Sequence, residues 1–321
     1  MGNVERARLG IILSAAVLSL LAACTSAGTS PARTSNSSIS RTTSSGASPA
    51  TKIGTSGTTA PIPRLTPAGA DGVPRFDHIV VVVEENKPYG ELVGTSSTPF
   101  LTALAGRGAV LTESYAITHP SQPNYLALFS GSTQGIGSDS CPHHFTGPNL
   151  AASLISAGDK FVGYVESLPS PEYTGCSAGP YARKHAPWVD FTLPASTSQP
   201  MTAFPTNLAQ LPELSFVIPN LENDMHDGSI DRGDRWLSTH LGAYATWATS
   251  HNSLLVVTTD EDDKSHANHI TTILAGAHIK PGNFETRVNH FGMLHTLLDS
   301  FDLPPFAGAA TAPAITTIWE R

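Results

Sequence analysis

The stretch that decides the fold is His78-Ile79-Val80-Val81-Val82-Val83-Glu84-Glu85-Asn86, in which a β-branched run ends in two carboxylates and an amide. A continuous apolar run of this kind is typical of a strand that is buried on both faces of a parallel sheet. Polar groups that directly follow such a strand lie at the carboxyl edge of the sheet, where α/β folds place their sites. The stretch therefore predicts both a central strand and the place of a site.

Further along the chain, apolar runs alternate with stretches of helical spacing. The expected strands cover residues 161–165, 214–218, 253–258 and 269–274, and the expected helices cover residues 100–105, 124–130, 150–157, 235–249 and 291–301. Strands that alternate with helices indicate an α/β domain with a largely parallel sheet. The stretch from about 135 to 200 is rich in Pro, Gly and aromatic residues, and we expect an insertion whose loops shape a pocket.

The N-terminus has the pattern of an export signal. Arg6 and Arg8 precede an apolar run over residues 9–23, which is short for a membrane-spanning helix. The run ends in Leu21-Ala22-Ala23-Cys24, which resembles the lipobox of bacterial lipoproteins, where the Cys is lipidated and becomes the new N-terminus. The alternative is an ordinary signal peptide with a chance Cys. Residues 1–24 are therefore expected to be a lipoprotein signal peptide, and the protein to be exported to the outer face of the cytoplasmic membrane.

Residues 25–70 are mostly Ser, Thr, Gly, Ala and Pro, so almost nothing there can be buried. Such a composition predicts a disordered tether that joins the anchor to a folded domain over residues 71–321. The net charge is −8 and the sequence has no basic block, which argues against binding to nucleic acid. The oligomeric state is not indicated by any pattern.

Two further cysteines, Cys141 and Cys176, lie inside the expected insertion. In an oxidising compartment an even number of cysteines favours a disulfide. The alternative is a pair of free, buried thiols. We expect the disulfide.

Acidic side chains follow two of the expected strands. Glu85 and Asn86 supply oxygen ligands of the kind that hard divalent cations prefer, and Asp260-Glu261-Asp262-Asp263 follows a second buried strand. Each group alone is also compatible with a solvated loop. Two such groups at strand ends of one sheet favour a shared metal ion.

The segment His119-Pro120-Ser121-Gln122-Pro123-Asn124 places a hydroxyl near the start of a short helix. The N-terminus of a helix offers free N–H groups and a partial positive charge, which suit a phosphate. Ser121 is therefore either an N-cap or a nucleophile. In a later loop, Asn223-Asp224-Met225-His226-Asp227-Gly228 brings carboxylates close to an imidazole that can protonate a leaving group.

Together these motifs resemble the bacterial phosphoesterase family of acid phosphatases and phospholipases C, which is related to the alkaline phosphatase superfamily. The matching stretches are residues 78–86, 119–125, 223–227, 259–261 and 289–291, and they span about residues 71 to 305. The resemblance implies a three-layer α/β fold like that of alkaline phosphatase, with a largely parallel central sheet flanked by helices. It also implies a small phosphate ester as the substrate.

The resemblance implies a role for each matching side chain. Ser121 would be the nucleophile that becomes a phosphoserine and also touches the metal. His226, oriented by Asp227, would handle the proton. The other implied metal ligands are Glu85, Asn86, Asp260 and Glu261. The implied phosphate-binding residues are His119, Asn124, His269 and His290.

This chain departs from the two-zinc members of the superfamily, which carry Asp-His where Asp260-Glu261 stands here. Its oxygen-rich set favours one divalent ion such as Ca, Mg or Mn, with Zn as the alternative. We expect an acid phosphatase that hydrolyses monoesters, because the sequence has no extra C-terminal domain of the kind that larger phospholipases C carry. The alternatives are a phosphodiesterase or phospholipase C, and a non-catalytic, metal-binding surface lipoprotein.

We predict that Cys24→Ser releases an active, soluble protein, because the catalytic residues lie far from the anchor. One acyl chain binds membranes only marginally, whereas several chains hold firmly. Wild-type protein should therefore stay with the membrane fraction in high salt. Wild-type protein in the soluble fraction, or a Cys24→Ser variant that stays membrane-bound, would contradict the lipid anchor.

Overall fold

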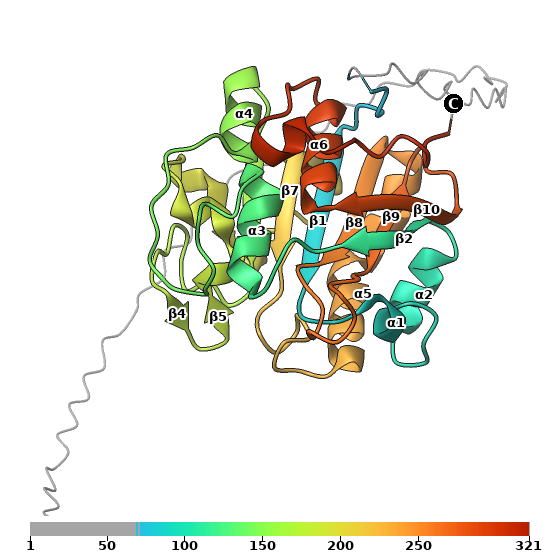
Figure 1. Cartoon of the computed structure of the whole chain (residues 1–321), viewed down its shortest axis with the longest axis horizontal. Coiled ribbons are helices and arrows are strands. Elements are labelled where there is room, and N and C mark those ends of the chain that lie inside the picture. The colour runs from blue at the N-terminus through green and yellow to red at the C-terminus, as the bar shows by residue number, and fades with distance from the viewer. Residues whose placement is uncertain (1–68, 70, 321) are drawn as a thin grey trace, which may run out of the picture. The chain divides into compact units, whose positions relative to one another are not determined.

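The computed structural model describes Gly69 and residues 71–320 (Figure 1). The predicted signal peptide, Cys24, and all of the predicted tether except Gly69 lie outside the described residues. Among the described residues, every helix is too short or too polar to cross a membrane.

The centre of the fold is an eight-stranded sheet in the order β10-β2-β9-β8-β1-β7-β3-β6. All strands run parallel except β9, which is antiparallel to both of its neighbours, β8 and β2. The strands are β1 (His78–Glu84), β2 (Ala109–Tyr115), β3 (Phe161–Val165), β6 (Ser198–Pro200), β7 (Leu214–Ile218), β8 (Ser253–Thr259), β9 (Thr272–Gly276) and β10 (Gly282–Asn289). A separate two-stranded sheet consists of β4 (Ser177–Ala178) and β5 (Tyr181–Ala182).

Helices cover both faces of the sheet. The α-helices are α1 (Tyr89–Leu92), α2 (Pro99–Ala105), α3 (Ser121–Ser130), α4 (Leu150–Ala157), α5 (Ile230–Trp247) and α6 (His290–Ser300). The short 3-10 helices are η1 (Arg183–His185), η2 (Pro187–Asp190), η3 (Ala195–Thr197), η4 (Met201–Ala203), η5 (Leu208–Gln210), η6 (Ala248–Ser250) and η7 (Ala307–Ala310).

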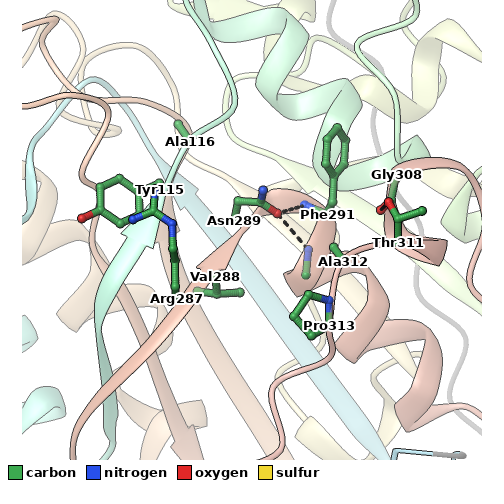
Figure 2. Close-up of a pocket in the computed structure, with 11 residues that line it drawn as sticks. Tyr115, Ala116, Arg287, Val288, Asn289, Phe291, Gly308, Thr311, Ala312 and Pro313 are labelled. Carbon is green, nitrogen blue, oxygen red and sulfur yellow. Dashed lines mark hydrogen bonds between the residues drawn. The ribbon is translucent and has the colours of Figure 1, made fainter.

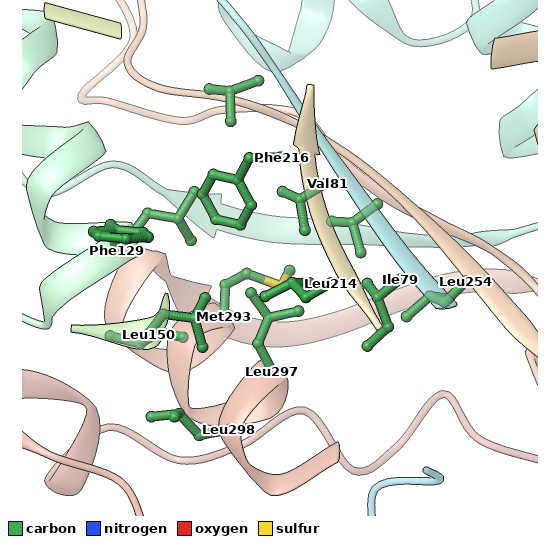
Figure 3. Close-up of a cluster of buried hydrophobic side chains, with 14 of the residues drawn as sticks. Ile79, Val81, Phe129, Leu150, Leu214, Phe216, Leu254, Met293, Leu297 and Leu298 are labelled. Carbon is green, nitrogen blue, oxygen red and sulfur yellow. The ribbon is translucent and has the colours of Figure 1, made fainter. Parts of the chain in front are cut away.

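The valine run of β1 explains why the fold has three layers. Successive side chains of a strand point to opposite faces, so a continuous apolar run needs cover on both. Ile79, Val81 and Val83 belong to a core shared with α3, α4 and α6 (Figure 3). Val80 and Val82 belong to a second core, shared with α2 and α5. The predicted three-layer α/β fold with a largely parallel sheet is confirmed.

Five strands were not predicted: β2, β10 and the short strands β4, β5 and β6. β2 carries polar, half-buried residues in its second half, and β10 is an edge strand with mostly exposed or half-buried side chains. The prediction of a strand over residues 269–274 was partly wrong, since β9 begins at Thr272 and runs antiparallel. His269 makes only an isolated bridge, to Tyr115.

α2 and α6 begin one residue earlier than predicted, and two further helices begin several residues earlier. α3 starts at Ser121 rather than at residue 124, because proline is tolerated in the first turn of a helix, where its missing N–H is not needed. α5 starts at Ile230 rather than at residue 235. Gly233 has a low intrinsic preference for helix, but it packs so closely that an added Cβ would lie 2.5 Å from the side chain of Met225.

The predicted disulfide between Cys141 and Cys176 is present, and it lies inside the expected insertion. The buried side chain of Arg183 also crosslinks the insertion, through hydrogen bonds. Its guanidinium donates to the carboxylate of Asp190 at 2.8 Å and to the carbonyl oxygen of His143 at 3.0 Å. The backbone N–H of Arg183 donates to the carbonyl oxygen of Cys176 at 3.0 Å. Both sides of the disulfide are therefore tied to η1.

We predict that the double variant Cys141→Ser/Cys176→Ser unfolds at lower denaturant, because the crosslink restricts the unfolded chain across a sequence separation of 35. The loss in free energy of unfolding is expected to be about 3 to 4 kcal/mol for a loop of this order. Urea titration checks this, and reductant should lower the midpoint of wild type but not that of the variant. Equal midpoints for both oxidised proteins would contradict the prediction.

Candidate functional site

Acidic side chains from three adjacent strands meet at the carboxyl edge of the sheet. Glu85 follows β1, Asp260 follows β8, and Asp224 lies in the loop after β7. Backbone contacts hold these segments together. The N–H of Glu85 donates to the carbonyl oxygen of Asp224 at 2.7 Å, and the N–H of Asn86 donates to Asp260 Oδ1 at 3.1 Å. The predicted partnership of Glu85, Asn86 and Asp260 is thus matched by their positions, and Asp224 joins them.

Ser121 lies beside this cluster as the first residue of α3. Its Oγ donates to Glu85 Oε2 at 2.9 Å, and the side chain is 1% exposed. The N-cap of α3 is Pro120, and no side-chain hydrogen bond caps this helix. The hydroxyl of Ser121 is therefore directed at the carboxylate cluster rather than used as an N-cap.

His185 completes the cluster and was not predicted from the sequence. Its Nε2 lies 3.1 Å from Glu85 Oε1, and its Nδ1 lies 3.4 Å from Asp224 Oδ2. Burial lowers the pKa of His185 well below its usual value, which favours the neutral ring. His185 lies on η1, inside the insertion, and it does not follow a strand of the eight-stranded sheet, so the rule that located the other site residues did not apply to it. The adjacent basic residues Arg183-Lys184 were the only local signal.

Several oxygen atoms of the cluster are buried without a hydrogen-bond partner among the described residues. They are Glu85 Oε1, Asn86 Oδ1, Asp224 Oδ2 and Asp260 Oδ2. An unpaired buried polar atom costs about 1–3 kcal/mol, and more where it is charged. His185 lies 3.1 Å from Glu85 Oε1 and 3.4 Å from Asp224 Oδ2 but forms no hydrogen bond with either oxygen, so these oxygens suit a partner other than a side chain of the described residues.

The carboxylates also oppose one another electrostatically. Burial, reinforced by the charges of Asp260 and Asp224, raises the pKa of Glu85 well above its usual range. Burial raises the pKa of Asp224 to about 7 and that of Asp260 to about 7. Three carboxylate groups, an amide oxygen and a hydroxyl form the donor set that hard divalent cations prefer. The residues present fit a metal ion of this class.

The carboxylate of Glu261 is hydrogen-bonded to His119 and Asn124. Its Oε2 accepts from His119 Nδ1 at 2.8 Å and from Asn124 Nδ2 at 3.3 Å. The other ring nitrogen of His119 lies 3.3 Å from the carboxylate of Asp262. The structure therefore pairs Glu261 with His119, whereas the sequence had suggested that it binds metal beside Asp260.

Asn124 holds the loop that leads into α3. Its Oδ1 accepts from the N–H groups of Ile117 and Thr118, each at 3.0 Å. Its Nδ2 donates to the carbonyl oxygens of Thr118 and Pro120. These bonds occupy the amide that the resemblance had assigned to phosphate, and they set the entry angle of Ser121.

His226 and Asp227 lie at the rim of the cluster. His226 Nδ1 donates to Asp227 Oδ1 at 2.7 Å, and the side chain of His226 is 30% exposed. The ring centres of His226 and His185 are 6.3 Å apart. An imidazole held by a carboxylate, accessible to solvent and close to the cluster, has the placement expected of a proton donor.

The other two predicted phosphate-binding histidines, His269 and His290, make contacts within the fold. His269 stacks on Tyr89 and on Tyr115, and its Nε2 donates to the carbonyl oxygen of Thr112 at 2.8 Å. His290 is buried, its Nε2 donates to the carbonyl oxygen of Asp260 at 2.6 Å, and burial lowers its pKa to about 4. His290 thus supports the backbone of the Asp260 loop.

A second group of potential ligands lies in the same loop. Asp262, Asp263 and His266 have ligand atoms close enough to share an ion, but the latter two are exposed. The carboxylate of Asp262 already accepts from the backbone N–H groups of Lys264, His266 and Asn268. This group stabilises the loop by itself and has less need of a cation than the buried cluster.

A cavity of about 510 Å³ lies where β2 and β10 end and α6 begins (Figure 2). The guanidinium of Arg287 lies over the ring of Tyr115, 4.2 Å from its centre. Asn289 caps α6 by accepting from the N–H groups of Phe291 and Gly292, which also line the cavity. The cavity opens at the same edge of the sheet as the cluster, but none of the cluster residues lines it.

Comparison with known proteins places these features in a family. Residues 95–304 match the model of the Phosphoesterase family. A phosphatidylinositol-3-phosphatase of Mycobacterium tuberculosis is 50% identical over 254 residues, which cover 78% of this chain and 85% of that protein. An acid phosphatase of Aspergillus fumigatus is 28% identical over 251 residues, which cover 71% of this chain and 56% of the fungal protein.

A solved structure supports the fold assignment. A protein of the alkaline phosphatase superfamily from Vibrio parahaemolyticus superimposes with a TM-score of 0.56 at 14% identity, covering 82% of this chain and 75% of that one. This likeness concerns the fold alone. With the family match and the similar phosphatases, it shows that the chain belongs to the phosphoesterase family and is a hydrolase acting on phosphoric esters.

Proposed function

We propose that this protein is a metal-dependent phosphatase that hydrolyses phosphate monoesters through a phosphoserine at Ser121. The observation that carries the proposal is the buried hydroxyl of Ser121, hydrogen-bonded to Glu85 within a cluster of unpartnered oxygens. A protein that only bound a metal would not require this hydroxyl. The names of the similar proteins, a phosphatidylinositol-3-phosphatase and an acid phosphatase, support a monoester as substrate.

Glu85, Asn86, Asp224 and Asp260 would hold the metal, with Ser121 beside it. This set replaces Glu261 of the sequence prediction by Asp224, because Asp224 has a free buried oxygen and Glu261 is bonded to His119. A bound divalent cation would lower the pKa of the serine hydroxyl and offset the charge of the phosphate. The oxygen-rich set favours Ca, Mg or Mn over Zn.

The residues of the chain account for the remaining steps. The proton of the Ser121 hydroxyl passes to Glu85 Oε2, to which it is already hydrogen-bonded, and Oγ forms a bond to phosphorus as the bond from phosphorus to the alcohol oxygen breaks. His226, oriented by Asp227, donates a proton to the departing oxygen. A water molecule then gives a proton back to His226 and attacks the phosphoserine, Ser121 Oγ recovers its proton from Glu85, and inorganic phosphate is released.

The natural substrate class is proposed from the similar phosphatase of Mycobacterium tuberculosis, whose name specifies a phosphoinositide. We infer that this chain also accepts the phosphate of an inositol lipid. An enzyme held at a membrane by Cys24, with its domain at the end of a tether over residues 25–70, would reach such a substrate. The signal peptide, the tether and export to the cell envelope rest on the sequence pattern.

We predict that Ser121→Ala lowers the turnover of p-nitrophenyl phosphate by on the order of 10⁴-fold or more, because the covalent step is lost. Ser156→Ala, an exposed hydroxyl on α4, is the matched control and should keep wild-type activity. Chelation should abolish wild-type activity, and single additions of Ca, Mg, Mn or Zn should identify the ion that restores it. Turnover of a choline phosphodiester but not of the monoester would establish the alternative, a phospholipase C. Substantial activity in Ser121→Ala would refute the nucleophile.

We also predict that Asp224→Ala and Asp260→Ala each lower the bound metal content, because each removes an unpartnered buried oxygen. Asp263→Ala is the matched control, since Asp263 belongs to the exposed group and should leave the content unchanged. Elemental analysis after dialysis provides the measurement. Loss of metal in the control alone would move the site to the Asp262 loop.

A further inference from the structure

Lys184 is a cation placed at the cluster by the insertion. It precedes His185 on η1, and its side chain is only 17% exposed. Its neighbour His185 lies 3.1 Å from Glu85 Oε1, so η1 brings Lys184 to the edge of the cluster. The neighbouring Arg183 cannot serve in the same way, because its guanidinium is bonded to Asp190.

Asp139 holds Lys184 near the nucleophile. Lys184 Nζ donates to Asp139 Oδ2 at 3.0 Å, and Asp139 Oδ1 accepts from the backbone N–H of Gln122 at 2.9 Å. Gln122 directly follows Ser121 in α3. One carboxylate therefore connects the ammonium to the first turn of the helix that carries the hydroxyl.

The ammonium of Lys184 has N–H donors that can bind a further group. A lysine ammonium carries three N–H donors, and within the described part of the chain only the bond to Asp139 is formed. A phosphate that enters beside Ser121 meets mostly carboxylates on the protein side. Lys184 is a side-chain cation that Asp139 connects to the helix carrying Ser121, and it can meet the negative charge together with the metal.

We propose that Lys184 recognises the phosphate by charge and selects dianionic monoesters over monoanionic diesters. The proposal rests on the proposed function, since it assumes that the phosphate is bound beside Ser121. A monoester carries one more negative charge than a diester near neutral pH, so its attraction to the ammonium is greater. Asp139 is a positioning residue, which acts on the substrate only through Lys184.

The test compares Lys184→Met and Lys184→Arg with wild type on p-nitrophenyl phosphate and on bis-p-nitrophenyl phosphate. Removing one preorganised donor from a water-poor site costs on the order of 10²- to 10³-fold in rate. We expect a loss of this order in kcat/KM for the monoester in Lys184→Met, and a loss of less than about tenfold for the diester. Lys184→Arg should recover most of the monoester activity.

Lys160→Met is the matched control, because Lys160 is exposed just before β3 at the opposite edge of the sheet and should keep wild-type kinetics. Equal losses on both substrates, or no loss on the monoester, would overturn the proposal. Wild type without chelator-sensitive monoester turnover would instead be a failure of the proposed function, and the two failures are therefore distinct.

A binding measurement decides the proposal where diester turnover is too slow to compare. Calorimetric titration of inorganic phosphate into the metal-loaded Ser121→Ala protein does not depend on catalysis. Adding Lys184→Met to that protein should raise the Kd by about tenfold or more, which corresponds to about 1.4 kcal/mol. An unchanged Kd with an intact fold, shown by an unchanged melting temperature, would overturn the proposal.

Discussion

Mutual repulsion among buried carboxylates is the constraint on which the rest of this structure depends. Glu85, Asp224 and Asp260 meet at one edge of the sheet with oxygens that lack partners, and burial raises the pKa of each. A protein does not keep such a cluster for stability, since unpaired buried charge is costly. A bound cation would offset the cost, as the proposed function requires. Glu84 shows the same tension one residue earlier, because burial and the charge of Asp224 raise its pKa well above its usual range.

Two hydrophobic cores, one on each face of the sheet, support the strands that carry this cluster. The valine run of β1 belongs to cores on both faces, so the strand ends that carry the acidic groups are held rigidly. Adjacent parallel strands place their carboxyl ends side by side, which brings together residues that are far apart in the sequence. The short helix η1 is not part of this sheet, and other contacts hold it at the site. The disulfide and the buried Arg183–Asp190 pair hold η1, which carries Lys184 and His185.

The histidines near the site differ in exposure and in hydrogen-bond partners, and these differences cannot be read from the residue type alone. His226 is partly exposed and held by Asp227, as a proton donor requires, whereas His290 is buried against the backbone of Asp260. His269 is fixed between aromatic rings, and His119 is bonded to Glu261. A histidine near a site can therefore support a loop as readily as it can bind substrate. Only the contacts of each ring separate the two roles.

The sequence by itself determined the central strand, the α/β class, the disulfide and most of the acidic cluster. The strand, the fold class and the acidic groups depend on local patterns, since an apolar run demands burial on both faces and polar residues directly after it fall at the edge of the sheet. The disulfide followed from the even number of remaining cysteines, whereas its geometry did not. The tertiary structure alone decided which oxygens remained free, because Glu261 and Asp224 look alike in the sequence and differ only in their neighbours. It also decided the parts played by Lys184 and His185, which lie in an irregular insertion without periodicity. Their positions follow from a disulfide, a buried ion pair and packing across the fold, and such long-range contacts leave no mark on the local sequence.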